Sequence, residues 1–166
     1  NITGGYMLTR HLLDTGRKNI GFVGSINATT SIMDRYLGYV RALHQAGIEP
    51  NPVWRIEDRG PDRKYMPLAL PETMPDAFVC NNDEVAFHLV ECLNQAGYAV
   101  PDDVAVVGYD DYRFSTICRP QLTTYHVYID EMAAAALECI QHKFANLPSD
   151  TSTHIIPGAF VLRNST

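Results

Sequence analysis

The chain has 166 residues, of which 46% are hydrophobic and 19% are charged. This length suits one compact body, and the composition excludes a disordered or polyelectrolyte chain. The formal net charge is −6, and no basic run interrupts the acidic background. Because binding to nucleic acid requires clustered cations, the chain is not expected to bind DNA by itself.

The cysteines and the start of the chain bear on its cellular compartment. Cys80, Cys92, Cys118 and Cys139 lie too far apart in sequence for the short spacings of zinc or redox sites, and we expect reduced, buried thiols. This usage favours the cytoplasm, and we predict no metal or cofactor. No apolar stretch approaches the roughly 20 residues of a membrane span. Residues 1–5 contain neither an initiating Met nor a signal core, so we expect the chain to be part of a longer one.

The first part of the chain predicts a helix, a strand and a second helix. Residues 6–14 have helical spacing and end before Gly16, which favours a left-handed stop. A short apolar run over 19–24 is typical of a strand buried on both faces of a parallel sheet. The second helix ends at Gly47 and carries an apolar stripe of Ile32, Tyr36, Tyr39, Val40 and Leu43.

Three more short apolar runs rich in β-formers predict strands at 53–56, 76–80 and 104–108. A helix with an apolar stripe over 85–93 precedes the last of these strands and ends at Gly97. The stretch 61–75 is rich in proline, which permits about two helical turns around Tyr65 and Leu68.

The last third of the chain has a different pattern. Residues 122–127 and 154–162 are expected to be extended, and Pro157-Gly158 interrupts the second of these segments. Between them, residues 129–144 predict a helix with Met132, Ala136, Ile140 and Phe144 on one face.

The alternation of short buried strands with helices predicts an α/β fold with a doubly wound parallel sheet. Ligands of such sheets bind beyond the carboxyl ends of the strands. The segments to inspect are therefore 25–35, 57–60, 81–84 and 109–112.

Polar side chains at these strand ends leave several chemistries open. The adjacent carboxylates Asp110 and Asp111 could hold Mg²⁺ in a phosphoryl-transfer enzyme, but the first strand lacks a phosphate-binding glycine loop or lysine. Asp110 could instead accept hydrogen bonds from a ligand or brace its loop. Arg35 could reach across the strand ends or remain a solvated helix residue, and Asn82 could cap the next helix or bind a hydroxyl.

Several segments together resemble the effector-binding core of the LacI/GalR family of bacterial transcription factors. The most specific one is Val-Pro-Asp-Asp-Val-Ala-Val-Val-Gly-Tyr-Asp-Asp over 100–111, followed by Pro120, Leu122, Thr123 and Thr124. Further similar segments are 4–12, 19–22, 35–43 and 82–83, so the resemblance covers nearly the whole chain.

The resemblance implies a core of two lobes, similar to periplasmic binding proteins, behind an N-terminal DNA-binding head that this chain lacks. It divides the chain into a linking helix (1–17), a C-terminal lobe (18–124 and 153–166) and a segment of the otherwise missing N-terminal lobe (125–152). It also implies a homodimer, a small-molecule effector, and DNA binding only through the absent head.

The same resemblance assigns effector contacts, residue by residue, to Arg35, Asn82, Asp110, Thr29 and Ser31. One departure is Arg59, which stands where many members of the family place an aromatic ring that stacks on the ligand. These polar groups best suit a sugar-like metabolite. We therefore expect a regulator without enzymatic activity, with an exported sugar-binding protein of a transport system as the alternative, and the phosphoryl-transfer enzyme ranked last.

Overall fold

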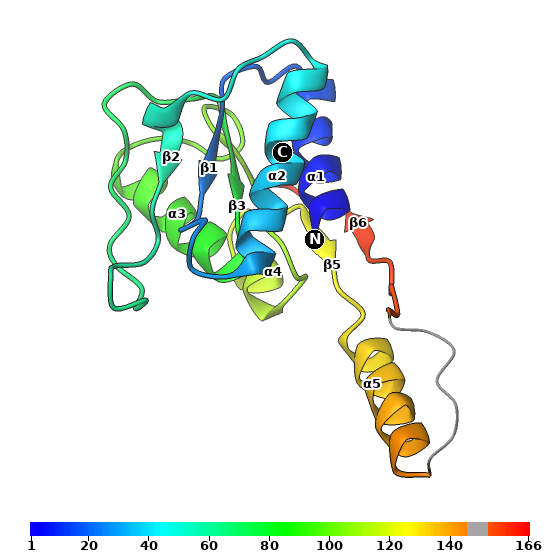
Figure 1. Cartoon of the computed structure of the whole chain (residues 1–166). Coiled ribbons are helices and arrows are strands. Elements are labelled where there is room, and N and C mark those ends of the chain that lie inside the picture. Colours follow the sequence, from blue (N-terminus) through cyan, green and yellow to red (C-terminus); the bar gives the residue numbers. More distant parts are fainter. Residues whose placement is uncertain (146–152) are drawn as a thin grey trace.

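The computed structural model describes residues 1–145 and 153–166 and shows a parallel sheet with helices on both faces (Figure 1). Its strands are β1 (Ile20–Val23), β2 (Arg55–Ile56), β3 (Ala77–Cys80) and β4 (Ala105–Val107), in the order β2-β1-β3-β4. Every residue of β1, β3 and β4 is buried, as expected for strands covered on both faces. The predicted α/β fold is confirmed.

Helices cover both faces of this sheet. The helices α1 (Ile2–Asp14) and α2 (Thr30–Gln45) lie on one face and α3 (Asp83–Gln95) lies on the other, with the short α4 (Arg113–Ile117) packed against α3 (Figure 1). Successive side chains of a strand point to opposite faces. Phe22 therefore packs in the core under α1 and α2, whereas Val23 packs in the core under α3.

Two glycines allow α1 and α2 to approach closely. A Cβ atom added at Gly5 would collide with the backbone oxygen of Arg35, and one added at Gly38 would collide with the backbone oxygen of Ile2. The absence of these side chains lets the two backbones touch. This contact sets the position of Arg35, which lies about one helical turn before Gly38.

The remaining strands form a separate two-stranded sheet beside the parallel one. β5 (Thr124–His126) pairs with β6 (Ala159–Val161) in an antiparallel ladder, and single bridges join Val107 to Thr123 and Asp110 to His126. From β5 the chain runs into α5 (Ile129–Phe144), which projects away from the sheet and buries none of its residues (Figure 1).

The structure corrects two predictions that involved proline. The expected strand 53–56 is a strand only at 55–56, because Pro52–Trp54 form the 3-10 helix η1, which Asn51 caps by accepting a hydrogen bond from the Val53 N–H. No helix forms over 61–75, where the prolines remove backbone donors. That stretch instead turns back so that Tyr65 forms an antiparallel bridge with Arg59.

Other boundaries and burial expectations also differ. The first helix begins at Ile2 rather than near residue 6, and the sequence did not predict α4. All four cysteines are free, and Cys80 and Cys118 are buried as expected, but Cys92 is half-buried and Cys139 is exposed on α5. The described part of the chain holds no helix long and apolar enough to cross a bilayer.

Candidate functional site

An ion pair between Arg35 and Asp110 lies at the carboxyl edge of the sheet. The Arg35 Nη2 atom is 3.0 Å from Asp110 Oδ1, and Nη1 donates a hydrogen bond to the backbone oxygen of Asn81. The Tyr109 ring lies against the guanidinium, with its centroid 3.8 Å from Arg35 Cζ. Contacts with residues that follow β3 and β4 therefore fix a side chain that sequence alone left open between solvent and ligand.

The loop after β4 holds its two aspartates in an unusual backbone conformation. The φ angles are 100° at Asp110 and 55° at Asp111, in the region that favours glycine. Two backbone hydrogen bonds to residues in and just after β5 maintain this conformation. Asp110 N–H donates to Tyr125 O at 2.9 Å, and Val127 N–H donates to Asp110 O at 3.3 Å. Burial raises the pKa of the Asp110 carboxyl above its usual value, although Arg35 acts in the opposite direction.

This backbone directs the two carboxylates to different partners. Asp111 accepts hydrogen bonds from Arg163 Nη2 at 2.6 Å and from Ser115 Oγ at 3.0 Å, and its other oxygen lies 2.9 Å from His126 Nδ1. Burial alone would raise the pKa of Asp111, but these hydrogen bonds outweigh it and leave the pKa below the usual value. Asp111 thus braces the end of the chain, and the adjacent aspartates do not form a joint cation site. No group of three metal-ligating side chains occurs in the described ranges.

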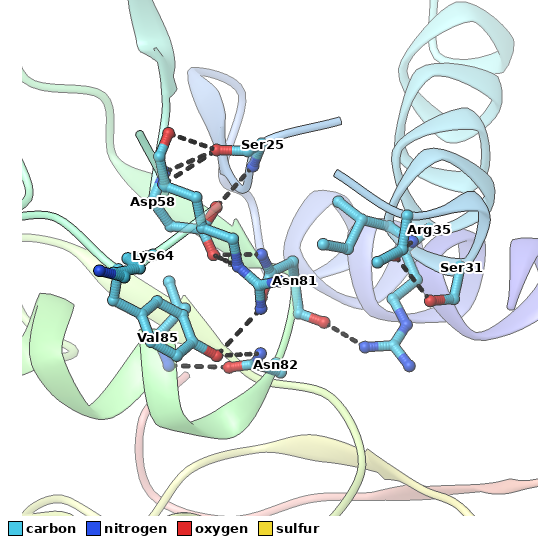
Figure 2. Close-up of polar contacts among 12 residues, drawn as sticks. Ser25, Ser31, Arg35, Asp58, Lys64, Asn81, Asn82 and Val85 are labelled. Atoms are coloured by element: carbon cyan, nitrogen blue, oxygen red, sulfur yellow. Dashed lines mark hydrogen bonds and ion pairs between the residues drawn. The ribbon is translucent and has the colours of Figure 1, made fainter. Parts of the chain in front are cut away.

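A second polar cluster lies around Tyr65, next to the Asn82 side chain that Figure 2 labels. Arg59 Nη2 donates to the Tyr65 hydroxyl at 3.1 Å, with Arg59 Cζ 4.7 Å from the ring centroid. Asn82 Nδ2 donates to the same hydroxyl at 3.4 Å, while Asn82 Oδ1 caps α3 by accepting from Val85 N–H at 2.8 Å. Asn82 therefore caps α3, the first of the two roles considered for it, and Tyr65 supplies an aromatic ring beside Arg59.

The buried carboxylate of Asp58, labelled in Figure 2, connects the two clusters, because its Oδ2 lies 3.5 Å from Arg59 Nε of the second cluster. Asp58 is 1% exposed and accepts hydrogen bonds from Ser25 N–H at 2.7 Å and from Asn81 Nδ2 at 2.8 Å. The backbone oxygen of Asn81 accepts from Arg35. Asn81 thus contacts both residues: its backbone oxygen holds the Arg35 guanidinium, and its side-chain amide holds the Asp58 carboxylate.

The predicted residues Thr29 and Ser31 lie at the start of α2. Thr29 Oγ1 caps the helix by accepting from Ile32 N–H at 3.2 Å, and it lies 3.0 Å from Ser31 Oγ. Ser31 and Arg35 line one cavity of about 530 Å³, and Asn82 and Asp110 line another of about 320 Å³. The structure brings Arg35 together with Asp110, and Arg59 with Asn82, whereas Thr29 has a capping role.

A buried carboxyl group behind the site was not predicted. Asp83 is 0% exposed, and it accepts hydrogen bonds from the Thr124 hydroxyl at 2.6 Å and from Tyr112 N–H at 2.7 Å. Burial raises the pKa of Asp83 to about 7. The sequence offered only a weak signal, because an aspartate at a helix start is ordinarily read as an exposed cap.

Comparisons with known proteins identify this architecture. A family profile described as a periplasmic binding protein-like domain matches residues 9–166. The HTH-type transcriptional repressor PurR of Mannheimia succiniciproducens is 32% identical over 167 residues, covering 98% of this chain and 50% of the repressor. The PurR repressor of Haemophilus influenzae strain PittEE is 34% identical, with 98% and 50% covered. The chain belongs to the periplasmic-binding-protein-like family, in its LacI/GalR branch.

Solved structures agree with this assignment. A LacI-type transcription regulator from Bifidobacterium animalis subsp. lactis superposes with a TM-score of 0.83 at 25% identity, covering 99% of this chain and 64% of that chain. The complex of the regulator CelR with cellobiose has a TM-score of 0.86 at 21% identity, covering 99% and 52%, and shows the shared fold alone. The chain spans about half the length of the curated relatives it matches. These relatives are transcriptional repressors rather than enzymes, and they favour a regulator over the transport alternative.

Proposed function

We propose that this chain is the effector-binding part of a DNA-binding transcriptional regulator, and that a small, polar, sugar-like metabolite contacts Arg35, Asp110 and Asn82. The observation that carries the proposal is the oriented pair of Arg35 and Asp110. One carboxylate oxygen bonds to Arg35, yet the Asp110 side chain stays 34% exposed beside a cavity. A carboxylate held in this way can accept hydrogen bonds from ligand hydroxyls.

The second part of the proposal concerns the two lobes. We assign 1–17 to a linking helix, 18–124 and 153–166 to the C-terminal lobe, and 125–152 to part of the N-terminal lobe; residues 146–152 lie outside the described ranges. The exposure of α5 supports this division, since a helix that buries nothing on its own sheet is available to pack on another lobe. A ligand held between lobes would stabilise a closed arrangement through its higher affinity for that state.

The setting proposed for the whole regulator follows its relatives. Repressors described as HTH-type bind through a helix-turn-helix, and we propose that DNA binding belongs to such a head rather than to this acidic chain. We also propose a cytoplasmic homodimer. Arg59, Thr29 and Ser31 remain proposed contacts at the rim of the site.

Thermal unfolding with named sugars tests the proposed function. Cellobiose, sucrose, glucose and ribose are each added to the wild-type chain and to Arg35→Ala, with Arg10→Ala as a control because Arg10 forms an exposed ion pair on α1. At least one sugar should raise the Tm of the wild type and of Arg10→Ala by a few degrees and leave Arg35→Ala unchanged. The absence of any shift in the wild type, or an equal shift in Arg35→Ala, would contradict the assignment.

A further inference from the structure

A further cavity, of about 310 Å³, lies between residues 65–68 of the proline-rich stretch and one side of α3. The α3 residues that line it recur every three to four positions and so share one side of the helix: Val85, His88, Glu91, Cys92 and Gln95. This stripe runs for about 15 Å along α3, from its first turn to its last residue. The cavity is separate from those that Arg35 or Asp110 line, because none of these α3 side chains belongs to their described linings.

The lining of this α3 cavity is mainly apolar, and its own side chains do not fill it. Val85 is 2% exposed, and Leu68 packs against the same core cluster, so the core holds this part of the lining in place. Tyr65 and Met66, by contrast, are 50% and 43% exposed. An apolar group that enters the cavity removes part of this surface from water, which favours its binding.

The lining carries two carboxylates and one histidine, and its described part contains no Lys or Arg. Asp58 is buried and satisfied by the hydrogen bonds described above, with Arg59 3.5 Å away. Glu91 differs, because its side chain is 51% exposed and, among the described residues, only its Oε2 has a partner, His88 Nδ1 at 3.1 Å. Glu91 Oε1 can therefore accept a hydrogen bond from an occupant of the cavity.

The thiol of Cys92 keeps the neighbouring part of the lining uncharged. Burial raises the pKa of the Cys92 thiol above its usual value, and the Glu91 carboxylate acts in the same direction. A protonated thiol packs as a small apolar group. One accessible carboxylate beside an apolar surface complements a cationic amine on an apolar body, whereas the same carboxylate repels an anion.

We propose that the α3 cavity is a second ligand site, which binds a small amine that carries an aromatic ring. The ammonium group donates to Glu91 Oε1, and the ring lies against Met66, whose thioether favours contact with an aromatic ring. A volume of about 310 Å³ is at the lower end of the roughly 300–1,000 Å³ of ligand pockets, so the ligand is small. This site does not depend on a ligand at Arg35 and Asp110.

Benzylamine is the probe that tests the site. In a chain labelled at its methionine methyl groups, the Met66 methyl resonance reports binding, and Met66→Leu assigns that resonance. At about pH 8, where an alkylamine is cationic, benzylamine should shift it saturably. Benzyl alcohol, which has a similar shape without the charge, should bind more weakly, and benzoate should not bind.

Glu91→Gln removes the carboxylate and keeps the shape of the side chain. It should weaken benzylamine binding about three- to tenfold, because a charge-assisted hydrogen bond at a half-exposed carboxylate is partly screened, and leave benzyl alcohol binding unchanged. The matched control is Glu72→Gln, which removes an equal charge from an exposed position in the same proline-rich stretch, outside the lining. This control should bind benzylamine as the wild type does.

Cys92→Phe should fill the cavity and abolish the saturable shift with both ligands. If that variant folds poorly, Gln95→Phe replaces it, because Gln95 is exposed at the far end of the lining. The absence of a saturable shift in the wild type would overturn the proposal, and so would undiminished binding to the folded filled variant or equally tight binding of benzoate. Failure of the sugar titrations would contradict the proposed function and leave this result unaffected.

Discussion

The buried carboxyl group of Asp83 makes stability depend on pH in an uncommon direction. Its pKa is about 7 in the fold against 3.8 for an unperturbed aspartate, so between these values the folded chain holds a proton that the unfolded chain has lost. The unfolding free energy should therefore fall as pH rises through this window, by at most about 1.4 kcal/mol per pH unit, and level off above it. Urea denaturation at a series of pH values measures this slope.

Asp83→Asn provides the comparison, because an amide keeps the shape and can still bond to Thr124 and to the Tyr112 N–H. The variant should lack the part of the slope that Asp83 causes. Identical slopes for the wild type and the variant would show that Asp83 does not titrate in the fold.

Asp111 should contribute to stability rather than to binding. Its carboxylate joins Arg163, Ser115 and His126, and the Asp111 and Arg163 side chains are each only 16% exposed. Asp111→Asn tolerates the left-handed backbone and should lower the unfolding free energy by about 1.5–3 kcal/mol. Asp14→Asn removes an exposed pair and should cost less than about 1 kcal/mol. If chemical denaturation showed the same loss of unfolding free energy for Asp111→Asn and Asp14→Asn, the Asp111 network would stabilise the fold no more than an exposed ion pair does.

The apolar side chains of α3 and α5 should contribute very differently to the stability of this chain. Leu89 of α3 is 0% exposed in the core, whereas Leu137 of α5 is 55% exposed. Leu89→Ala should therefore lower the unfolding free energy by about 2–5 kcal/mol, whereas Leu137→Ala should change it by no more than about 0.5 kcal/mol. Urea denaturation of dilute protein compares them, and a large cost for Leu137→Ala would mean that α5 packs on its own sheet.

The arrangement of α5 has a consequence for the whole molecule. Its exposed apolar residues are Ile129, Met132, Leu137, Ile140 and Phe144. Leaving large apolar side chains in water forgoes roughly 1.5–3 kcal/mol each, so this chain should associate with itself, most simply as a dimer, and bind a hydrophobic dye.

Sedimentation over a range of concentrations tests this association. Ile140→Glu, which places a charge on the exposed face, should weaken it, whereas Glu138→Gln on the same helix should not. A wild-type monomer at every concentration, with no dye binding, would contradict both the association and the role of the exposed face.

The sequence by itself determined the α/β class and the edge at which the site lies. Short apolar runs bounded by glycine and separated by amphipathic helices allow few arrangements other than a parallel sheet, and the carboxyl ends of parallel strands share one edge. Arg35, Asn82 and Asp110 could therefore be placed near one another from their positions after strands. Local rules failed where proline dominated, at 53–56 and 61–75, because turn geometry there depends on contacts distant in sequence.

Only the tertiary structure decided what each polar side chain contacts. The close crossing of α1 and α2 at Gly5 and Gly38 places Arg35 on Tyr109, and the left-handed backbone after β4 separates Asp110 from Asp111. Hydrogen bonds and ion pairs require atoms to meet within a few tenths of an ångström. Sequence periodicity specifies which face or edge a residue occupies, whereas such distances depend on helix crossings and loop torsions that only the complete fold sets.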